Sequence, residues 1–134
     1  IAEREGVVPG TVMTMMADGL GTQPAKEAYD RKVVGVVSEA GGLSPGMVLG
    51  SRADGSNDLP VAIAGQVYVR VNLEGGDIAV GDLLVSSGKP GVAMKASDPM
   101  KAFGATVGKA LAPFTEKDLK ENGEGLLLML VMNH

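Results

Sequence analysis

The chain has 134 residues, with 12 Lys and Arg against 16 Asp and Glu, which gives a formal net charge of -4. No cluster of basic residues is present, so nucleic acid is not expected as a partner, and the absence of Cys excludes disulfides and thiolate metal sites. Apolar residues make up 45% of the chain but aromatic residues only 3%, so the core must consist of Val, Leu, Ile, Ala and Met.

The length predicts a single domain over residues 1–134 that buries its own core without crosslinks. No apolar run reaches the ~20 residues of a membrane span, and the start lacks a signal-peptide pattern, so no membrane partner is expected. The chain starts with Ile1 rather than Met, and this predicts a fragment or a processed product of a longer protein.

Short runs rich in Val, Ile and Leu, bounded by Gly, Pro, Asn or Asp, predict β-strands along the whole chain. The alternation of Val67, Val69 and Val71 with Tyr68 and Arg70 is typical of a half-buried strand. The last run is apolar at every position, so it is expected at the centre of a sheet or at a subunit interface. The predicted strands are residues 10–16, 32–39, 46–51, 59–72, 82–87, 92–96, 105–112 and 125–132.

Two very short helices are expected between these strands. Asp98 is placed to cap a helix that starts at Pro99 and ends at Gly104. Residues 115–123 start with a Thr, have an acidic residue three positions later and end on a Gly, which predicts a short exposed helix with a solvated charged face.

The strand pattern shows a weak internal repeat. Residues 8–19 match residues 79–91, residues 24–40 match residues 99–112, and "AGQVYVRV" matches "GEGLLLMLV". A β unit that cannot cover its own apolar face can bury that face most simply by packing against its copy. The sequence therefore predicts a mainly-β fold, a compact barrel or sandwich built from two similar β units at about residues 8–72 and 79–132.

Residues that could carry chemistry are few. The stretch "SGKPG" around Lys89 superficially resembles a phosphate-binding loop, but Pro90 follows the lysine and the next element is a strand, so a hairpin turn is favoured. His134 is the last residue and is interpreted as a frayed terminus or the start of a tag.

Two further groups remain formally possible. Nucleophilic catalysis could use Ser38 or Ser97 with Asp30 or Lys95 as a base, although turn and cap roles explain these residues more simply. Four oxygen donors within five positions could hold Ca²⁺, but the rest of a calcium loop is missing and an exposed hairpin tip is favoured. These donors are Asp54, Ser56, Asn57 and Asp58. No catalytic, cofactor-binding or metal-binding residue is assigned.

Several ordered motifs carry a resemblance to a known family. They are "DRKVVGVVSEAGGLSPGMVLGS", "LPVAIAGQVYVRV", "GGDIAVGDLLVSSGKPGVAMKASDPMKAFGATVGKAL" and "GEGLLLMLVM". Together they cover about residues 9–132, and their order resembles the β-rich C-terminal domain of bacterial and phage-related fibre or appendage proteins. The chain is also distantly similar to the C-terminal domain of phage neck-appendage and tail-spike proteins.

The resemblance implies a domain that assists trimerisation as an intramolecular chaperone and that can release itself by autoproteolysis. It also implies a shaft region of the same chain upstream of Ile1, and an insertion at residues 115–122. No cleavage motif matches a position here, so autoproteolysis is the only enzymatic activity considered and it has no assigned residue.

Surplus apolar strand surface in "LLLMLVM" and "PVAIAG" is most simply hidden by association between copies. We expect a non-enzymatic module that self-associates, with a trimer favoured over a filament, to form or cap an extracellular fibre or a phage-like appendage, and its expected location is extracellular or on a virion or appendage surface. Two alternatives stay open. One is a self-cleaving chaperone domain whose Ile1 was created by the cut, and the other is a capsid-decorating β protein.

Overall fold

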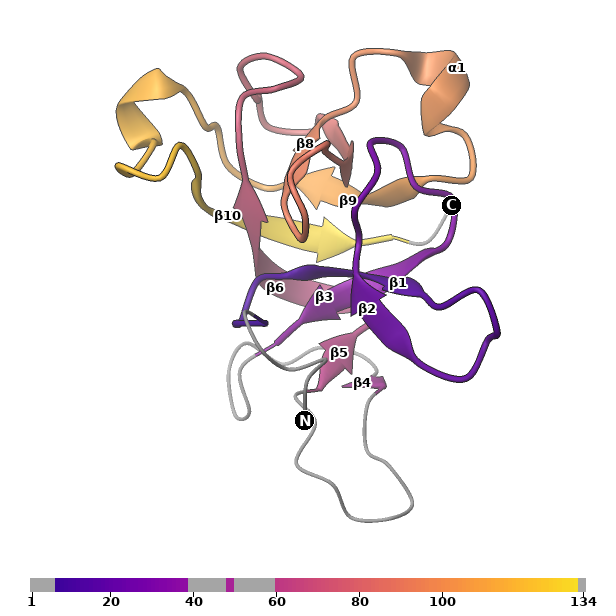
Figure 1. Cartoon of the computed structure of the whole chain (residues 1–134). Coiled ribbons are helices and arrows are strands. Elements are labelled where there is room, and N and C mark those ends of the chain that lie inside the picture. Colours follow the sequence, from indigo (N-terminus) through magenta and orange to yellow (C-terminus); the bar gives the residue numbers. More distant parts are fainter. Residues whose placement is uncertain (1–6, 39–47, 50–59, 133–134) are drawn as a thin grey trace.

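The computed structural model describes residues 7–38, 48–49 and 60–132 of the chain (Figure 1). The described part is mainly β, which confirms the predicted fold class, and it contains two very short helices. The strands are β1 (Val12–Met15), β2 (Thr22–Pro24), β3 (Val33–Val37), β4 (Val48–Leu49), β5 (Val61–Ala62), β6 (Gly65–Val71), β7 (Leu83–Ser86), β8 (Ala93–Lys95), β9 (Thr106–Ala110) and β10 (Gly125–Val131). The helices are α1 (Pro99–Ala102) and the 3-10 turn η2 (Glu116–Asp118).

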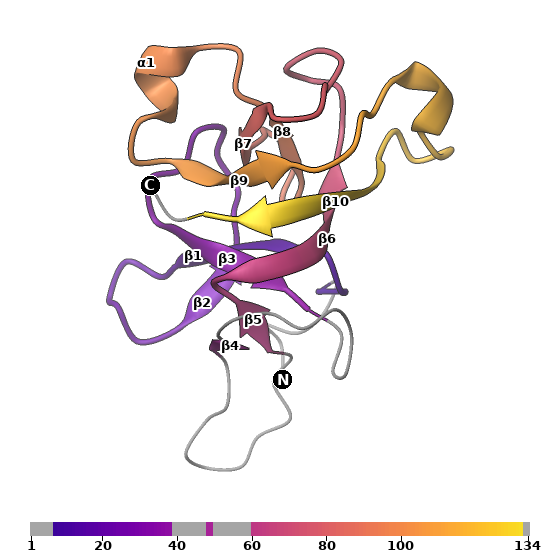
Figure 2. The same cartoon turned by 180° about the vertical axis from the view of Figure 1, so that it is seen from behind.

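The strands form an open sheet and a closed barrel. The sheet has the antiparallel order β2-β1-β3-β5-β4, and the barrel has the order β10-β6-β8-β7-β9. Within the barrel, β6 and β10 form a seven-residue antiparallel ladder from Gly65 opposite Val131 to Val71 opposite Gly125. The circle closes through one parallel pair, Val71 opposite Ala93. Figure 2 shows β10 between β6 and β9.

The sheet and the barrel repeat one pairing pattern. The order β2-β1-β3 in the sheet corresponds to β8-β7-β9 in the barrel, and each pattern has a register shift, after Met13 in β1 and after Leu84 in β7. Met13 lies opposite Gly35, and Leu84 lies opposite Gly108. A Cβ at Gly35 would overlap the Ala62 carbonyl, and a Cβ at Gly108 would overlap the Leu130 carbonyl. The glycine in each half is therefore required by a close backbone approach, not by turn geometry.

One hydrophobic core joins the sheet to the barrel. Val12 and Val36 of the sheet and Leu84 and Met129 of the barrel are all fully buried members of a single cluster. Burial of each such side chain is worth roughly 1.5–3 kcal/mol relative to leaving it exposed. The core therefore lies between the open sheet and the barrel and continues inside the barrel.

The predicted strands are found with two corrections. The predicted run over residues 59–72 breaks at residues 63–64 into β5 and β6, and β6 begins at Gly65, whose φ of 86° redirects the chain there. The strand β2, with the sequence TQP, was missed because it has no apolar run. The predicted strand over residues 46–51 contains β4, while its other residues lie outside the described part.

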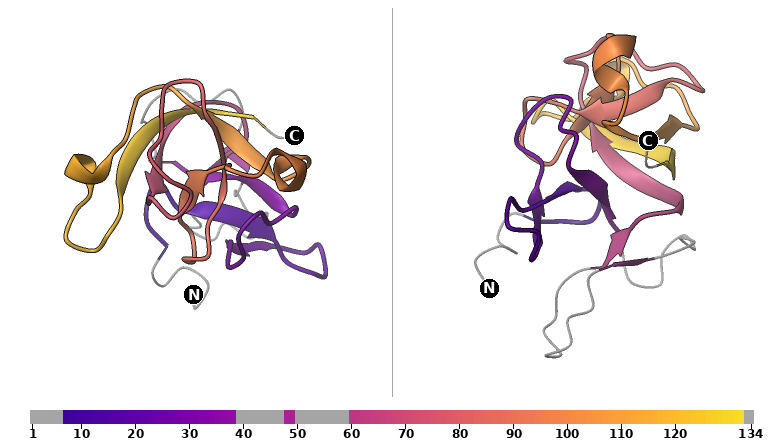
Figure 3. Two further views of the ribbon diagram at one scale, coloured as in Figure 1. Left: turned by 90° about the horizontal axis from the view of Figure 1, so that it is seen from above. Right: turned by 90° about the vertical axis from the view of Figure 1, so that its right-hand side faces the viewer.

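Both predicted helices are present at the predicted caps, but they are short. Asp98 caps α1 by accepting hydrogen bonds from the Met100 amide at 3.1 Å and the Lys101 amide at 3.4 Å. Over residues 115–123 only the single turn η2 forms, and the Thr115 amide donates to Asp118 Oδ2 at 2.9 Å. Figure 3 shows α1 and η2 on opposite sides of the barrel. No helix in the described ranges is long and apolar enough to cross a membrane.

Candidate functional site

Strands β6 and β10 present apolar side chains on the side away from the core. Val67, Val69, Leu127 and Met129 point inward and are buried, as the two-residue period requires. The apolar residues on the opposite side form what we call the outer face, and they are Tyr68, Leu126, Leu128 and Leu130. Two polar residues of β6 share this side, Gln66 opposite Leu130 and Arg70 opposite Leu126. Tyr68 is 53% exposed, Leu126 48% and Leu130 37%, while Leu128 lies half-buried opposite Tyr68.

The strand β10 was predicted to lie centrally or at a subunit interface. It pairs with β6 on one side and with β9 on the other, so it is central within the barrel. Of its alternate residues, Leu126 and Leu130 nevertheless remain exposed, and Leu128 is half-buried. The central position of β10 thus explains why its inward residues are apolar. It does not explain why the outward residues Leu126 and Leu130 are apolar.

The apolar surface continues from the outer face across β9 to β7. Leu130 lies opposite Lys109, and Lys109 lies opposite Leu83, which is exposed. Lys109 makes no ion pair within the described residues, and it places one positive charge between two apolar neighbours.

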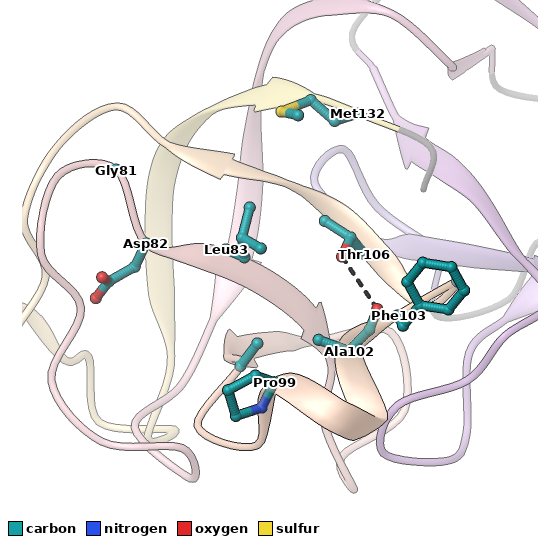
Figure 4. Close-up of a pocket in the computed structure, with 10 residues that line it drawn as sticks. Gly81, Asp82, Leu83, Pro99, Ala102, Phe103, Thr106 and Met132 are labelled. Carbon is teal, nitrogen blue, oxygen red and sulfur yellow. Dashed lines mark hydrogen bonds between the residues drawn. The ribbon is translucent and has the colours of Figure 1, made fainter.

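Beside Leu83, a hollow of about 420 Å³ opens between the barrel and α1 (Figure 4). Its polar side chains already have partners. Thr106 Oγ1 donates to the Ala102 carbonyl at 3.1 Å, and Asp82 Oδ2 accepts from the Ala79 amide at 2.8 Å and lies 3.5 Å from Lys95 Nζ. The hollow therefore suits an apolar group more than a polar ligand.

The α1 helix holds two large apolar side chains out in solvent. Met100 is 88% exposed and Phe103 is 83% exposed, whereas Ala102 is the one residue of α1 that is buried. We call Met100 and Phe103 the α1 knob. Phe103 lines the hollow described above and also a second hollow of about 670 Å³, so the knob protrudes between two depressions.

The α1 knob is fixed in place by contacts at its base. The Asp98 amide donates to the Tyr29 hydroxyl at 3.0 Å, and Lys101 Nζ lies 5.9 Å from the centre of the Tyr29 ring. Tyr29 itself adopts φ 56°, a conformation that costs a non-glycine residue about 1 kcal/mol and that persists because its surroundings hold it. The α1 knob is thus exposed although the backbone that carries it is held in place by these contacts.

A cluster of charged side chains lies where β6 ends and β10 begins, beside Leu126 of the outer face. Arg70 Nε lies 2.6 Å from Glu124 Oε1 and Arg70 Nη2 lies 3.2 Å from Oε2, while Lys89 Nζ lies 2.7 Å from Oε2. Arg70 Nη1 also donates to Thr11 Oγ1 at 3.0 Å. Burial alone would raise the pKa of Glu124, but the hydrogen bonds and charges of Arg70 and Lys89 outweigh it and hold that pKa below its ordinary value of 4.5. Since every carboxylate oxygen has a cationic partner, the cluster serves the structure of the barrel.

The structure does not join the candidate nucleophiles and bases into a catalytic arrangement. The Asp30 carboxylate accepts from the Lys32 amide at 2.8 Å, which is the turn role favoured for it. Lys95 contacts Asp82 at 3.5 Å, the Ser38 amide donates to the Pro60 carbonyl at 2.9 Å, and Ser97 is exposed.

The stretch around Lys89 forms the turn of the β7–β8 hairpin, as predicted. The lysine donates to the Asn122 carbonyl at 3.0 Å besides its contact with Glu124. The Ca²⁺ candidates at residues 54–58 and His134 lie outside the described residues. Within the described ranges, no group of three or more His, Cys, Asp or Glu is placed to hold a metal ion.

Comparisons with protein-family models, with curated proteins and with solved structures found no match to this chain. The similarity to fibre-terminal domains therefore remains an expectation from the ordered motifs. The sequence predicts that β10 takes part in association, and this stays a prediction, whereas the exposed α1 knob was not predicted. No signal in "DPMKAFG" marks these two side chains as exposed, because residues three positions apart share one face of a helix and could equally well have faced the core.

Proposed function

We propose that this chain is a self-associating structural module that forms or caps an extracellular fibre or a phage-like appendage. The observation that carries the association is the outer face, where Tyr68, Leu126 and Leu130 lie together in solvent on two long paired strands. The largest exposed apolar patch on a soluble protein is often functional, and patches larger than a few hundred Å² mark interaction surfaces. The fibre or appendage setting rests on the resemblance of the ordered motifs.

The arrangement of the strands favours a second copy as the partner on this surface. The outer face stands on the long ladder of the barrel, so its backbone amides and carbonyls are already paired and it can be covered only by side-chain packing. Packing of one barrel against another buries such a face without any rearrangement of the chain. Closed assemblies of identical subunits are the commonest way in which proteins hide such surfaces.

The experiment compares the native mass of the wild type with that of Leu126→Thr/Leu130→Thr, measured by light scattering at micromolar concentration. Threonine keeps the strand propensity and removes most of the apolar area. The matched control is Leu20→Thr, since Leu20 is even more exposed, at 88%, but lies on the β1–β2 turn. We expect the wild type and the control to form oligomers and the double variant to be monomeric. A monomeric wild type would refute the proposed association.

A further inference from the structure

We infer that copies of this chain join head to tail, so that the outer face of one copy covers the α1 knob of the next. The inference rests on the proposed self-association and states which surfaces meet. It follows from the presence of two separate apolar surfaces of different shape on one barrel. The outer face lies over two paired strands, and the α1 knob is a protrusion between two hollows.

The exposed areas of the two surfaces match. With about 200 Å² for a fully exposed large side chain, the exposed fractions of Tyr68, Leu126 and Leu130 amount to roughly 300 Å². Met100 and Phe103 together expose roughly the same area. A symmetric contact of two outer faces would cover the first area and leave the second in water. A head-to-tail contact covers both.

The size of this contact also favours a chain or ring of copies over a single pair. Roughly 600 Å² of apolar area, in an interface that is about 60% apolar, corresponds to about 1,000 Å² buried in total. That is near the lower limit for a specific interface, so one contact alone is weak. In a closed ring every copy makes the contact twice, and both surfaces of every copy are covered.

Charge argues against a symmetric contact between two α1 knobs. Arg31, Lys101 and Glu74 line the hollow on one side of Phe103, so two knobs that met each other would bring four cations together with only two carboxylates. The Glu74 carboxylate is exposed and accepts from the Gly88 amide at 3.1 Å. When an outer face covers the knob instead, Lys109 at the edge of that face can approach Glu74, which gives the unpaired lysine a carboxylate partner.

The test mixes two variants, each of which lacks one of the two surfaces. The face variant is Leu126→Thr/Leu130→Thr, and the knob variant is Met100→Gln/Phe103→Gln. All four substituted side chains are exposed, and far-UV circular dichroism with urea unfolding verifies that both variants fold as the wild type does. Head-to-tail contact predicts that each variant alone is monomeric by sedimentation velocity. It also predicts that an equimolar mixture forms a complex of one copy of each and nothing larger, because the intact face of one binds the intact knob of the other. Since this pair makes only one contact, the mixture is measured over rising concentration, and a mixture that stays monomeric at concentrations where the wild type associates would refute the inference.

A symmetric contact of outer faces predicts a different result. The knob variant would then associate like the wild type, and the face variant would add nothing to the mixture, which would overturn the inference while leaving the proposed self-association intact. If the wild type itself is monomeric, both the proposed function and the inference fail.

Should a variant not fold, the wild type provides a second measurement. Equal amounts of ¹⁵N-labelled and unlabelled protein are mixed and treated with an amine-reactive crosslinker. Isotopically mixed Lys101–Lys109 pairs are expected from the head-to-tail contact. Mixed Lys109–Lys109 pairs without mixed Lys101–Lys109 pairs would refute it.

Discussion

Replacement of Glu124 by Gln should destabilise the barrel by about 2 kcal/mol. The side chain of Glu124 is 7% exposed, and its carboxylate is bound by Arg70, which is 18% exposed, and by Lys89, which is 41% exposed. Glutamine keeps the shape of the side chain but removes the charge and turns an NH₂ group toward cationic donors. The guanidinium of Arg70 then stays largely buried without a counter-charge.

The magnitude follows from the burial of the two partners. Removal of one member of a fully buried ion pair costs about 3–5 kcal/mol, whereas an exposed pair contributes roughly 0–1 kcal/mol. The Arg70 contact is near the first limit and is bidentate, while the Lys89 contact is near the second. We therefore expect about 2 kcal/mol for Glu124→Gln and no more than about 0.5 kcal/mol for Lys89→Met.

The assay is urea unfolding followed by far-UV circular dichroism at neutral pH. With a slope of about 2 kcal/mol per molar urea, Glu124→Gln should lower the midpoint by about 1 M, and Lys89→Met should lower it by about a quarter of that. The double variant Arg70→Met/Glu124→Met should recover part of the loss, because no charge is left buried. Equal midpoints for Glu124→Gln and the wild type would refute the assignment of the cluster as a stabilising element.

Three further outcomes are expected. The pKa of Glu124 is lowered in the folded state, so the carboxylate contributes its full stabilisation above about pH 4.5. The difference in unfolding free energy between wild type and Glu124→Gln should therefore shrink as the pH falls from 4.5 through that lower pKa. A difference that grows on acidification would contradict the lowered pKa. Gly108→Ala should cost about 1–3 kcal/mol in urea unfolding because its Cβ meets the Leu130 carbonyl, whereas Gly21→Ala, which meets only a flexible side chain, should cost less than half as much; equal costs would refute the close-approach explanation. Asp98→Ala should lower the unfolding free energy by about 1 kcal/mol through loss of the α1 cap, and an unchanged midpoint would show that the cap contributes nothing.

Several elements could be predicted from local sequence features. The alternation of residues 67–71 predicted a strand with one buried face, and this is how β6 lies. Asp98 and Pro99 predicted the start of α1 at the residue where it begins. These features depend on neighbours within a few positions, so the sequence contains all the information that they need.

Two features could not be predicted, because their own residues do not specify them. The strand β2 has the sequence TQP and is held by pairing with β1, so nothing in its own residues marks it. The break at Gly65 depends on a positive φ that a glycine permits but does not require.

Local patterns were sufficient to predict a mainly-β chain with two similar runs of strands, two short capped helices and a last strand that is apolar on both faces. The contact of Glu124 with Arg70, 54 positions away, and the exposure of Leu126 and Leu130 beside the buried Leu127 and Met129 depend on how the strands pack together. The same holds for Phe103, which protrudes beside a hollow. The physical reason is that burial and charge pairing depend on which distant segments pack together, and a local pattern states only that a face is apolar, not what covers it.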